Sequence, residues 1–418
     1  MSMPSKPFNR SIVLILFLLP ATLIGCQEKK SPWDLQTDKG KVLFQQRNFS
    51  GAEQALKSAL QEAEPFGEQD PRLIQSLTNL AMVYDAQGHY DKAEPLLKRI
   101  VTLQESQKDT KGMGLASGLS NLATLYYHQK KYTKAKALFE RALTIRKKAM
   151  GSDGPGLVQD LKNLAALHIH QHEYKKATPY LVRTLEIAEK VHGKDDPSIV
   201  SHLNNLALLY RAQKQYQQAE SMLRRALAVN EKFLGPDNPK LVGSLNNLAV
   251  LYGTQQSYEQ AEPLLKREIA IIEKAFGPDH PRLGPNLNQL ADLYRAQGKI
   301  DQAIPLLQRA IHLVEKAESP EDPALTSPLN NLALLYFKQG SYDQAEPLYK
   351  RALSIAEKST GKESRTVERT LRNYAALLRK SQRASEANMY EARADAIHHK
   401  QDGKNQPIKD NLKTKGNG

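Results

Sequence analysis

The sequence predicts an all-α fold in which short helical repeats stack into an elongated array. The first observation is a period of 42 residues, which is seen in tripeptides such as Asn-Leu-Ala that begin at Asn79, Asn121, Asn163, Asn205, Asn247, Gln289, Asn331 and Asn373. The second is a position that is alanine in all nine units: Ala52, Ala93, Ala135, Ala177, Ala219, Ala261, Ala303, Ala345 and Ala387. A fixed period of this length indicates units that pack on their neighbours, because one unit alone cannot bury its apolar face.

Each unit is expected to hold two helices. In the unit over 198–234, Leu203, Leu206, Ala207 and Tyr210 follow the spacing i, i+3, i+4, i+7 and form the apolar stripe of a first helix. A second helix containing Ala219 follows the polar break 213–215, and its constant alanine indicates close approach of two helix backbones. The expected repeats lie near 33–66, 74–107, 116–149, 158–191, 200–233, 242–275, 284–317, 326–359 and 368–401.

Loops of the form Gly-x-x-x-Pro separate the units. They occur at 67–71, 193–197, 235–239 and 277–281. Glycine suits the left-handed residue just after a helix, and proline suits the first turn of the next helix. These loops therefore mark the boundaries between successive repeats.

The pattern resembles the tetratricopeptide repeat, a helix–turn–helix unit with small residues at fixed positions and a tyrosine in its first helix. The stretch Leu-Asn-Asn-Leu-Ala-Leu-Leu-Tyr at 203–210, together with the loops, resembles the long-repeat variety found in kinesin light chains. The resemblance covers residues 33–401 and implies a right-handed superhelical α-solenoid of about nine helix–turn–helix repeats. It indicates the fold and not a particular function, because one fold hosts many functions. A motor role is not implied, since no long heptad region accompanies the repeats.

The units at both ends depart from the pattern. The first has Gly40 where the others have alanine, and the ninth has a polar second helix with Arg383, Glu386 and Arg393. Such atypical end units are expected as solubilising caps. Residues 402–418 contain four lysines and few apolar residues, so we expect a disordered basic tail there.

Residues 1–25 are expected to be a signal peptide. Lys6 and Arg10 precede an apolar run over 12–24, which is shorter than the roughly 17–25 residues of a spanning helix. The segment 23–26, Leu-Ile-Gly-Cys, resembles a bacterial lipobox, in which a peptidase cuts before a cysteine that carries diacylglycerol. Lipidation is therefore expected at Cys26, with 26–32 as a short linker. An ordinary secretory signal and a short signal anchor are the alternatives.

The lipobox resemblance implies a place in the cell. It implies a lipid-anchored protein of the bacterial cell envelope, and in a Gram-negative organism Gln27 implies the outer membrane, with the array facing the periplasm. The short linker would hold the array close to the membrane. Because Cys26 is the only cysteine, no disulfide is expected once it is lipidated.

The basic composition limits the classes of partner. The formal net charge is +14, and loss of Lys6 and Arg10 with the signal peptide would leave +12 (14 − 2). A basic excess can indicate nucleic acid or an anionic surface. Lysine and arginine are spread over every unit and no nucleic-acid motif is present, so we predict no nucleic-acid binding. Attraction to anionic lipid or polysaccharide stays an alternative.

The sequence offers little catalytic chemistry. It has no phosphate-binding glycine loop, no zinc-type cysteine pair, no HExxH helix and no serine in a nucleophile elbow. His168 and His172 are spaced i, i+4 and are the best candidate metal ligands. His168, however, occupies a position that is tyrosine in six other units, which favours packing, and the pair His398-His399 is a weaker candidate. We predict no enzyme activity, cofactor or metal site, and an enzyme with an unrecognised site is the alternative.

The candidate binding residues lie on the first helices. In the tetratricopeptide family these helices line a concave groove, and a carboxamide there offers two donors and an acceptor to a peptide backbone. The alternative is that asparagine ties one unit to the next. Adjacent residues differ by about 100° around a helix, so we expect one member of each asparagine pair to be structural and the other to face the ligand. The candidates are Asn204, Asn205, Asn246, Asn247, Asn288, Asn330, Asn331, Arg211, Arg295 and Lys338.

Charge on the same helices suggests the chemistry of the partner. Other positions expected in the groove are Asp85, Tyr127, Lys162, Asp292, Phe337, Arg372 and Arg379. Positive residues outnumber negative ones, so a partner carrying carboxylates would fit. The sequence thus predicts a membrane-anchored scaffold that binds a partner protein or peptide segment in its groove. A pilotin-like assembly factor for an envelope machine is the alternative.

Overall fold

A computed structural model describes residues 30–107 and 112–405, so the expected signal peptide, Cys26 and Gln27 lie outside the described residues. The described residues contain 18 α-helices, five short 3-10 turns and no strand. The chain divides into two compact units, residues 1–215 and residues 216–418. The prediction of an all-α array of about nine repeats is confirmed.

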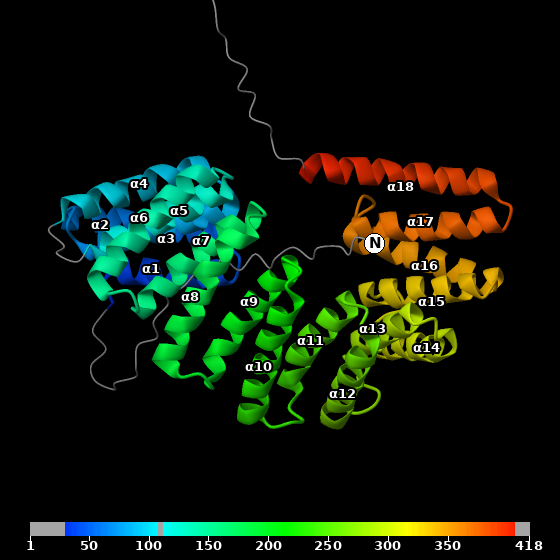
Figure 1. Ribbon diagram of the computed structural model, residues 1–418. Helices are drawn as coiled ribbons and strands as arrows, with labels where there is room; N and C mark the ends of the chain where they lie inside the picture. The colour runs from blue at the N-terminus through cyan, green and yellow to red at the C-terminus, as the bar shows by residue number, and fades with distance from the viewer. Residues whose placement is uncertain (1–29, 108–111, 406–418) are drawn as a thin grey trace, which may run out of the picture. The chain divides into compact units, whose positions relative to one another are not determined.

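The first unit contains the helices α1 to α9 (Figure 1). Their bounds are α1 (Pro32–Gln45), α2 (Phe49–Ala63), α3 (Pro71–Gln87), α4 (Tyr90–Ser106), α5 (Met113–His128), α6 (Tyr132–Met150), α7 (Val158–His170), α8 (Tyr174–His192) and α9 (Val200–Ala212). The short 3-10 turns are η1 (Glu64–Phe66), η2 (Pro155–Leu157) and η3 (Pro197–Ile199). Within this unit α1, α3, α5 and α7 each pack on the helix that follows, and each pair packs on the next.

The second unit contains the helices α10 to α18. Their bounds are α10 (Tyr216–Leu234), α11 (Val242–Thr254), α12 (Tyr258–Phe276), α13 (Leu283–Ala296), α14 (Ile300–Ala317), α15 (Thr326–Lys338), α16 (Tyr342–Thr360), α17 (Arg365–Lys380) and α18 (Ala384–Asn405). The short 3-10 turns are η4 (Pro239–Leu241) and η5 (Pro323–Leu325). The pairs α11–α12, α13–α14, α15–α16 and α17–α18 pack on one another in chain order.

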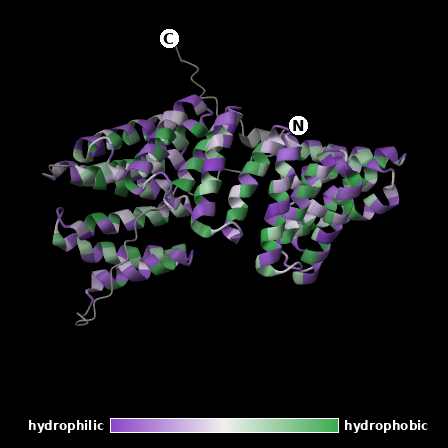
Figure 2. Ribbon diagram, turned by 60° about the horizontal axis from the view of Figure 1, so that its bottom comes forward, coloured by the Kyte–Doolittle hydropathy of each residue, from purple (hydrophilic) through white to green (hydrophobic). Residues whose placement is uncertain are grey.

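The core lies between the helices of each pair and between neighbouring pairs. All nine constant alanines have no exposed surface, as expected from a close contact of helix backbones. Leu203, Leu206 and Ala207 are buried as the apolar stripe predicts. Hydrophobic and hydrophilic residues share the same helices, so each helix has one buried and one solvated side (Figure 2). No helix in the described part of the chain is both long and apolar enough to cross a membrane.

The loops between repeats depart in one detail from the expectation. Gly193 and Gly277 have positive φ values of 97° and 94°, but their ψ of 160° places them in a region reserved for glycine rather than in the left-handed helical region. Asp196 then accepts a hydrogen bond of 2.8 Å from the backbone N–H of Ser198. Pro197 begins a 3-10 turn, and α9 follows from Val200. The proline therefore starts a short turn that leads into the helix.

The end repeats are modified where the array stops. Gly40 is buried, and a Cβ at this position would lie 2.5 Å from Cγ of Leu56, which explains why alanine is absent. In the last repeat, Ala394 and Ile397 of α18 are buried against Leu353 and other apolar residues. The helix continues to Asn405, four residues into the segment expected to be a disordered tail. The rest of that segment lies outside the described residues.

Hydrogen bonds with the 42-residue period join neighbouring repeats. The hydroxyl groups of four first-helix tyrosines donate to glutamates on the preceding second helix. These pairs are Tyr84–Glu53, Tyr126–Glu94, Tyr252–Glu220 and Tyr294–Glu262, at 3.3, 3.1, 2.7 and 2.9 Å. The tyrosine position therefore combines a mostly buried ring with a satisfied polar tip.

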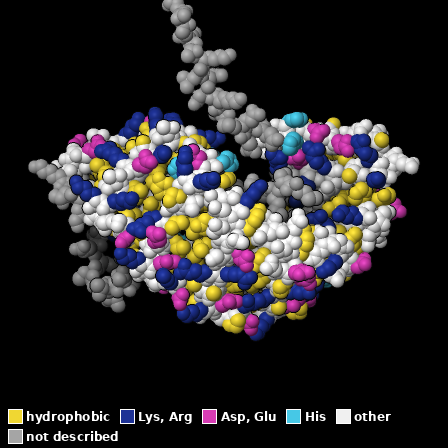
Figure 3. Space-filling model, viewed as in Figure 1, with side chains coloured by type: hydrophobic (Ala, Val, Ile, Leu, Met, Phe, Trp, Pro, Cys, Tyr) yellow, Lys and Arg dark blue, Asp and Glu magenta, His cyan; other side chains and the backbone are white. Residues whose placement is uncertain are grey.

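Arginine also recurs every 42 residues, at 99, 141, 183, 225, 267, 309, 351 and 393. Within each unit these side chains form ion pairs with an acid of the preceding repeat. The pairs are Arg99–Glu64, Arg141–Glu105, Arg183–Asp153, Arg267–Glu231, Arg309–Glu273, Arg351–Glu315 and Arg393–Glu357. Basic and acidic side chains are accordingly interspersed on the visible surface of each unit (Figure 3). Part of the basic excess therefore serves to join repeats.

We expect Ala261→Leu to destabilise the array by about 1–3 kcal/mol, because the fully buried Cβ of Ala261 leaves no room for further atoms. The measurement is the melting temperature followed by circular dichroism. Ala296→Leu is the matched control, since Ala296 is exposed on α13. Equal melting temperatures for the two variants would contradict the close-contact argument.

Candidate functional site

Carboxamide side chains on the first helices of the second unit bond to one another across repeats. The Nδ2 atom of Asn246 donates to Oε1 of Gln289 at 2.6 Å. The Nδ2 atoms of Asn331 and Asn373 donate to Oδ1 of Asn288 and Asn330 at 3.0 and 3.1 Å. Each bond joins the first carboxamide position of one repeat to the second position of the next. We call this set the asparagine seam: Asn246, Asn288, Gln289, Asn330, Asn331 and Asn373.

The asparagine seam uses both members of a pair. Asn288 and Gln289 each bond a different neighbouring repeat, and so do Asn330 and Asn331. Asn331 also donates to Oδ2 of Asp292 at 3.2 Å, and Asn330 is 2% exposed. These bonds favour the inter-repeat interpretation in the second unit, where we expected one member of each pair to remain for a ligand. Asn247 is also engaged in an interaction.

The predicted cationic residues of the second unit differ in their pairing. Nε of Arg295 donates to Oδ1 of Asp292 at 3.2 Å, so its charge is partly satisfied inside the protein. Arg379 donates to Asn388 at 3.0 Å and forms an ion pair with Glu391. Lys338 is exposed at the end of α15 and has no ion pair among the described residues. Of the predicted cations Arg295 and Lys338, only Lys338 is therefore fully available to a partner.

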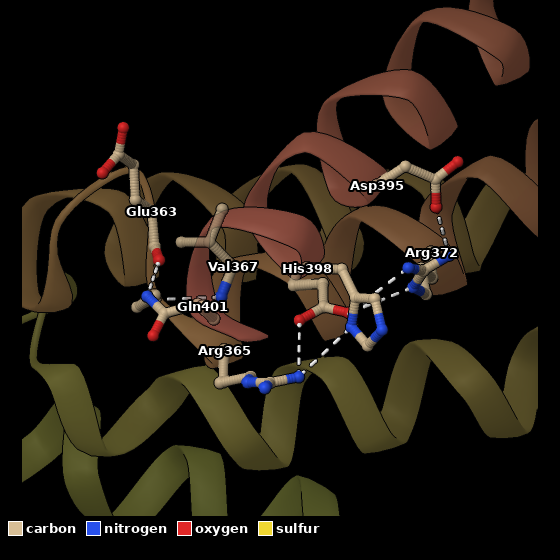
Figure 4. Close-up of polar contacts among 9 residues, drawn as sticks. Glu363, Arg365, Val367, Arg372, Asp395, His398 and Gln401 are labelled. Carbon is tan, nitrogen blue, oxygen red and sulfur yellow. Dashed lines mark hydrogen bonds and ion pairs between the residues drawn. The ribbon is translucent and has the colours of Figure 1, made fainter. Parts of the chain in front are cut away.

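Charged side chains gather in the last repeat around the buried carboxylate of Glu368. Oε1 of Glu368 lies 3.1 Å from Nδ1 of His398 and 3.3 Å from Nη2 of Arg372. Arg365 lies 3.2 Å from the same histidine nitrogen, and Arg372 also forms an ion pair of 2.9 Å with Asp395 (Figure 4). This network joins α17 to α18 and occupies His398, the weaker metal candidate. The described residues contain no cluster of three or more ligands suited to a metal ion.

A buried carboxylic acid lies beneath the asparagine seam. Glu268 on α12 is 0% exposed, at a position where other second helices have Ala226, Ala310 and Ala352. Its Oε2 accepts a hydrogen bond of 2.6 Å from Asn286, and its Oε1 has no partner. Burial raises the pKa of Glu268 to about 7, and the carboxamides of Asn286 and Asn246 oppose this only in part.

The first unit places its predicted site residues differently. Asn204 is engaged in an interaction. Asn205 and Arg211 on α9 are partly buried, and their side chains have no hydrogen bond or ion pair among the described residues. Lys162 on α7 is also partly buried and unpaired there, and burial lowers the pKa of its amine. These three side chains retain their hydrogen-bonding capacity for a partner.

A second basic side chain lies near Lys162. His202 on α9 is 8% exposed, and its Nδ1 lies 3.1 Å from Oγ1 of Thr184. Burial, followed by the charge of Lys162, lowers the pKa of His202 to about 4. The acid of the same region, Asp160, is 1% exposed and already paired with Arg146. Lys162 therefore has a basic neighbour, and it forms no ion pair with an acid in the described part of the chain.

Aromatic rings and histidines cluster near the ends of α5 and α7. The ring of Tyr127 packs edge-on against Tyr132 and His170, with centroid distances of 5.7 and 5.8 Å. The hydroxyl of Tyr132 lies 3.1 Å from Nε2 of His170. Nδ1 of His128 lies 2.8 Å from Oδ2 of Asp85, so the predicted groove residue Asp85 contacts the following repeat. The cluster joins three successive repeats.

The candidate metal pair His168 and His172 is separated by its contacts. His168 is 3% exposed, its Nδ1 lies 2.7 Å from Oε2 of Glu173, and its ring stacks on Tyr180. His172 has a positive φ of 59° in the turn and contacts the hydroxyl of Tyr174 at 3.0 Å. The structure thus gives His168 a packing role like that of the tyrosines at the equivalent positions.

The arginines that join neighbouring repeats were not predicted, although their positions follow the 42-residue period. The arginines that join repeats recur at steps of 42 as strictly as the alanines. Glu268 shows the opposite signal, because it stands where Ala226, Ala310 and Ala352 lie in other repeats. Lys162 stands in a variable column, which holds Thr78 and Ser120 before it and Asn204 after it. Exceptions to a repeat were the available indication of special chemistry.

Comparisons with known proteins agree on one architecture. A family model described as "Tetratricopeptide repeat" matches residues 34–106, 114–190, 160–232, 198–271, 240–316 and 325–397, and a second model with this description matches 288–360. No curated protein matches the chain.

Several solved structures are similar to parts of this chain. BtubC (BKLC) from P. vanneervenii is 24% identical with a TM-score of 0.47, and the match covers 54% of this chain and 91% of that chain. The putative kinesin light chain nearly identical TPR-like repeats of Podosopora anserina are 25% identical with a TM-score of 0.43, and cover 49% and 97%. Aspartyl phosphate phosphatase F from Bacillus subtilis is 17% identical with a TM-score of 0.49, and covers 90% and 96%.

We expect Glu268 to make the second unit less stable as the pH rises. The pKa of Glu268 is about 7 in the folded chain against 4.5 as the ordinary value, so the folded state binds the proton more tightly. Its contribution to the free energy of unfolding is therefore lost as the pH rises from about 4.5 to about 7, by up to about 3 kcal/mol. Glu268→Gln removes this loss.

The measurement compares melting temperatures of wild type and Glu268→Gln at pH 5 and pH 8. The variant should gain at pH 8 relative to wild type, and this gain should shrink at pH 5. Glu259→Gln is the matched control, because Glu259 is exposed on the same helix. His202 has the opposite effect: because its pKa is lowered to about 4 in the folded chain, its contribution to the free energy of unfolding is lost as the pH falls below about 6.5. This effect is the same in wild type and variant, so the comparison between them cancels it. A gain independent of pH would contradict the assignment.

We expect the Asn288–Asn331 hydrogen bond to stabilise the fold. A double-mutant cycle with Asn288→Ala and Asn331→Ala should give a coupling free energy of about 0.5–1.5 kcal/mol, the net value of one hydrogen bond. Asn121→Ala serves as the control, because Asn121 is exposed and its side chain has no hydrogen bond among the described residues. Additive losses from the two single variants would show that the seam does not stabilise the array.

Proposed function

The chain belongs to the tetratricopeptide repeat family, and from this premise we propose that it is a scaffold that binds an extended peptide segment of a partner protein on its first helices. Tetratricopeptide repeats typically serve as binding scaffolds without enzymatic activity, and their domains bind protein or peptide partners. A stack of repeats presents its first helices side by side, which suits an extended ligand.

The observation that carries this proposal is the set of unpaired polar side chains on the first helices. In the first unit they include Asn121, Lys162, Asn205 and Arg211, and in the second unit Lys338 is exposed without an ion pair among the described residues. In the second unit, by contrast, the carboxamides of the asparagine seam bond a neighbouring repeat. The unpaired groups are cations and carboxamides, which suit the carboxylates and the backbone of a peptide.

The second part of the proposal is a lipid anchor at Cys26 in the bacterial cell envelope, with the outer membrane as its site. It is supported by the lipobox-like segment 23–26 and by Gln27. The helix α1 begins at Pro32, so residues 27–31 separate it from Cys26. A linker of this length spans at most about 20 Å, and it would hold the array next to the bilayer.

Photo-crosslinking in cells tests both parts of the proposal. A benzoylphenylalanine in place of Ala212, which is exposed on α9 beside Arg211, should capture a discrete partner. The same group in place of the exposed Lys175 on α8 is the control and should capture none. Cys26→Ser should leave the membrane fraction or stay uncleaved. Equal capture at both positions would overturn the binding face, and unchanged fractionation with unchanged mature mass would overturn the anchor.

A further inference from the structure

The first described helix exposes apolar side chains along one side. On α1, Leu35, Lys39 and Val42 follow the spacing i, i+4, i+7, so they form one stripe along the helix, and all three are exposed. We call these three residues the α1 stripe. Leu35 is 54% exposed and Val42 is 50% exposed, and with Phe66 they make three of the eight large apolar side chains exposed in the described part of the chain. Single exposed apolar residues are ordinary, but a group of them on one repeat indicates a contact surface.

In the next repeat, the corresponding side of the first helix is covered. When α1 and α3 are aligned at Gly40 and Ala81, Leu35 corresponds to Ser76, which is 0% exposed. Oγ of Ser76 accepts a hydrogen bond of 2.8 Å from Nε1 of Trp33 on α1, so this side of α3 faces the preceding repeat. On α1 the same side has no repeat in front of it among the described residues. The α1 stripe is therefore a packing side of the array that lacks its cover.

The last helix carries a different kind of stripe. On α18, Asn388, Ala392 and Asp395 have the same spacing and are also exposed, but they include no large apolar side chain. Met389 is the one large apolar side chain that is exposed among the described side chains of α18. A terminal repeat needs a polar outer face to remain soluble. The last repeat meets this requirement, whereas the α1 stripe presents Leu35 and Val42 at the surface.

The α1 stripe also carries a positive charge. Lys39 lies between Leu35 and Val42 and has no ion pair among the described residues. The neighbouring Asp38 does not offset this charge, because it pairs with Lys30 at 2.7 Å. A lysine can lay its apolar stem along a hydrophobic surface while its amine stays at the headgroups of a bilayer. An apolar stripe with a lysine therefore suits an anionic lipid surface.

From this arrangement we propose that the α1 stripe rests on an anionic phospholipid surface, with Leu35 and Val42 at the acyl boundary and Lys39 at the headgroups. The inference rests on the proposed lipid anchor and adds the side of the array that meets the bilayer. Residues 27–31 connect Cys26 to α1 and span at most about 20 Å, so an anchored chain holds α1 within reach of the lipid. A short tether makes this contact intramolecular, and a small apolar stripe is then sufficient.

The test uses Trp33, which is the only tryptophan of the chain and lies on α1. Full-length protein purified from membranes is reconstituted into vesicles of phosphatidylethanolamine and phosphatidylglycerol, with brominated or unbrominated acyl chains. Bromine quenches tryptophan fluorescence only at close range. Brominated lipid should therefore quench Trp33 in wild type, and vesicles of phosphatidylcholine alone should give weaker quenching.

The decisive variant is the double substitution Leu35→Gln and Val42→Gln, because glutamine removes the apolar contact and still favours a helix. It should stay attached to the vesicles through the lipid and lose most of the quenching, with a melting temperature equal to that of wild type. Val191→Gln is the matched control, since Val191 is 47% exposed on α8 of the same unit. This control should be quenched like wild type. Lys39→Gln should reduce the difference between the two kinds of vesicle.

The outcomes separate this inference from the proposed anchor. A mature mass without lipid, together with no attachment to vesicles, would overturn the anchor and the lipid contact with it. Attached protein that shows no quenching, or equal quenching in wild type and the double variant, would overturn the contact and leave the anchor intact. Trp33 emission that changes with protein concentration in the absence of lipid would show that a second copy covers the α1 stripe. That result, or a fall in melting temperature for the double variant, would also overturn the lipid contact.

Discussion

The structure depends on the close contact of helix backbones at the nine constant alanines. A helix pair of this size cannot bury its apolar face alone, so each repeat is stable only against its neighbours. The contact leaves no exposed surface at any of the nine alanines. In a second column of small residues, on the first helices, Gly40 stands where other repeats have alanines such as Ala81, because Leu56 occupies the space of a Cβ. The tyrosine–glutamate bonds and the arginine ion pairs then join surfaces that this packing has already brought together.

Many polar side chains on the surface join one repeat to the next. Arginines of the second helices pair with acids of the preceding repeat, and carboxamides of the first helices pair along the asparagine seam. Individually such surface ion pairs contribute about 0–1 kcal/mol, but they repeat with the array. The candidates for contact with a partner protein are consequently side chains of the first helices that remain unpaired among the described residues. Lys162, Asn205 and Arg211 belong to this group, and Arg295 does not.

Departures from the repeat mark the places where one junction differs from the next. Glu268 and Lys162 each replace a small or neutral residue of their column and bring an ionisable group into a partly or fully buried position. Glu268 is satisfied on one oxygen by Asn286, and it responds to pH within the second unit. Lys162 has no internal partner among the described residues, and therefore suits an external one.

The sequence by itself determined the helices, their period and the buried alanines, because 3.6-residue periodicity and loop residues such as Gly193 and Pro197 act locally. It also identified His168 as a packing residue from its column. Only the tertiary structure decided which carboxamides pair, that Oε1 of Glu268 lacks a partner, and that Lys162 stands without a counterion. These facts depend on side chains about 18 to 43 residues apart that meet only after the repeats have stacked. Local sequence rules do not predict these tertiary contacts.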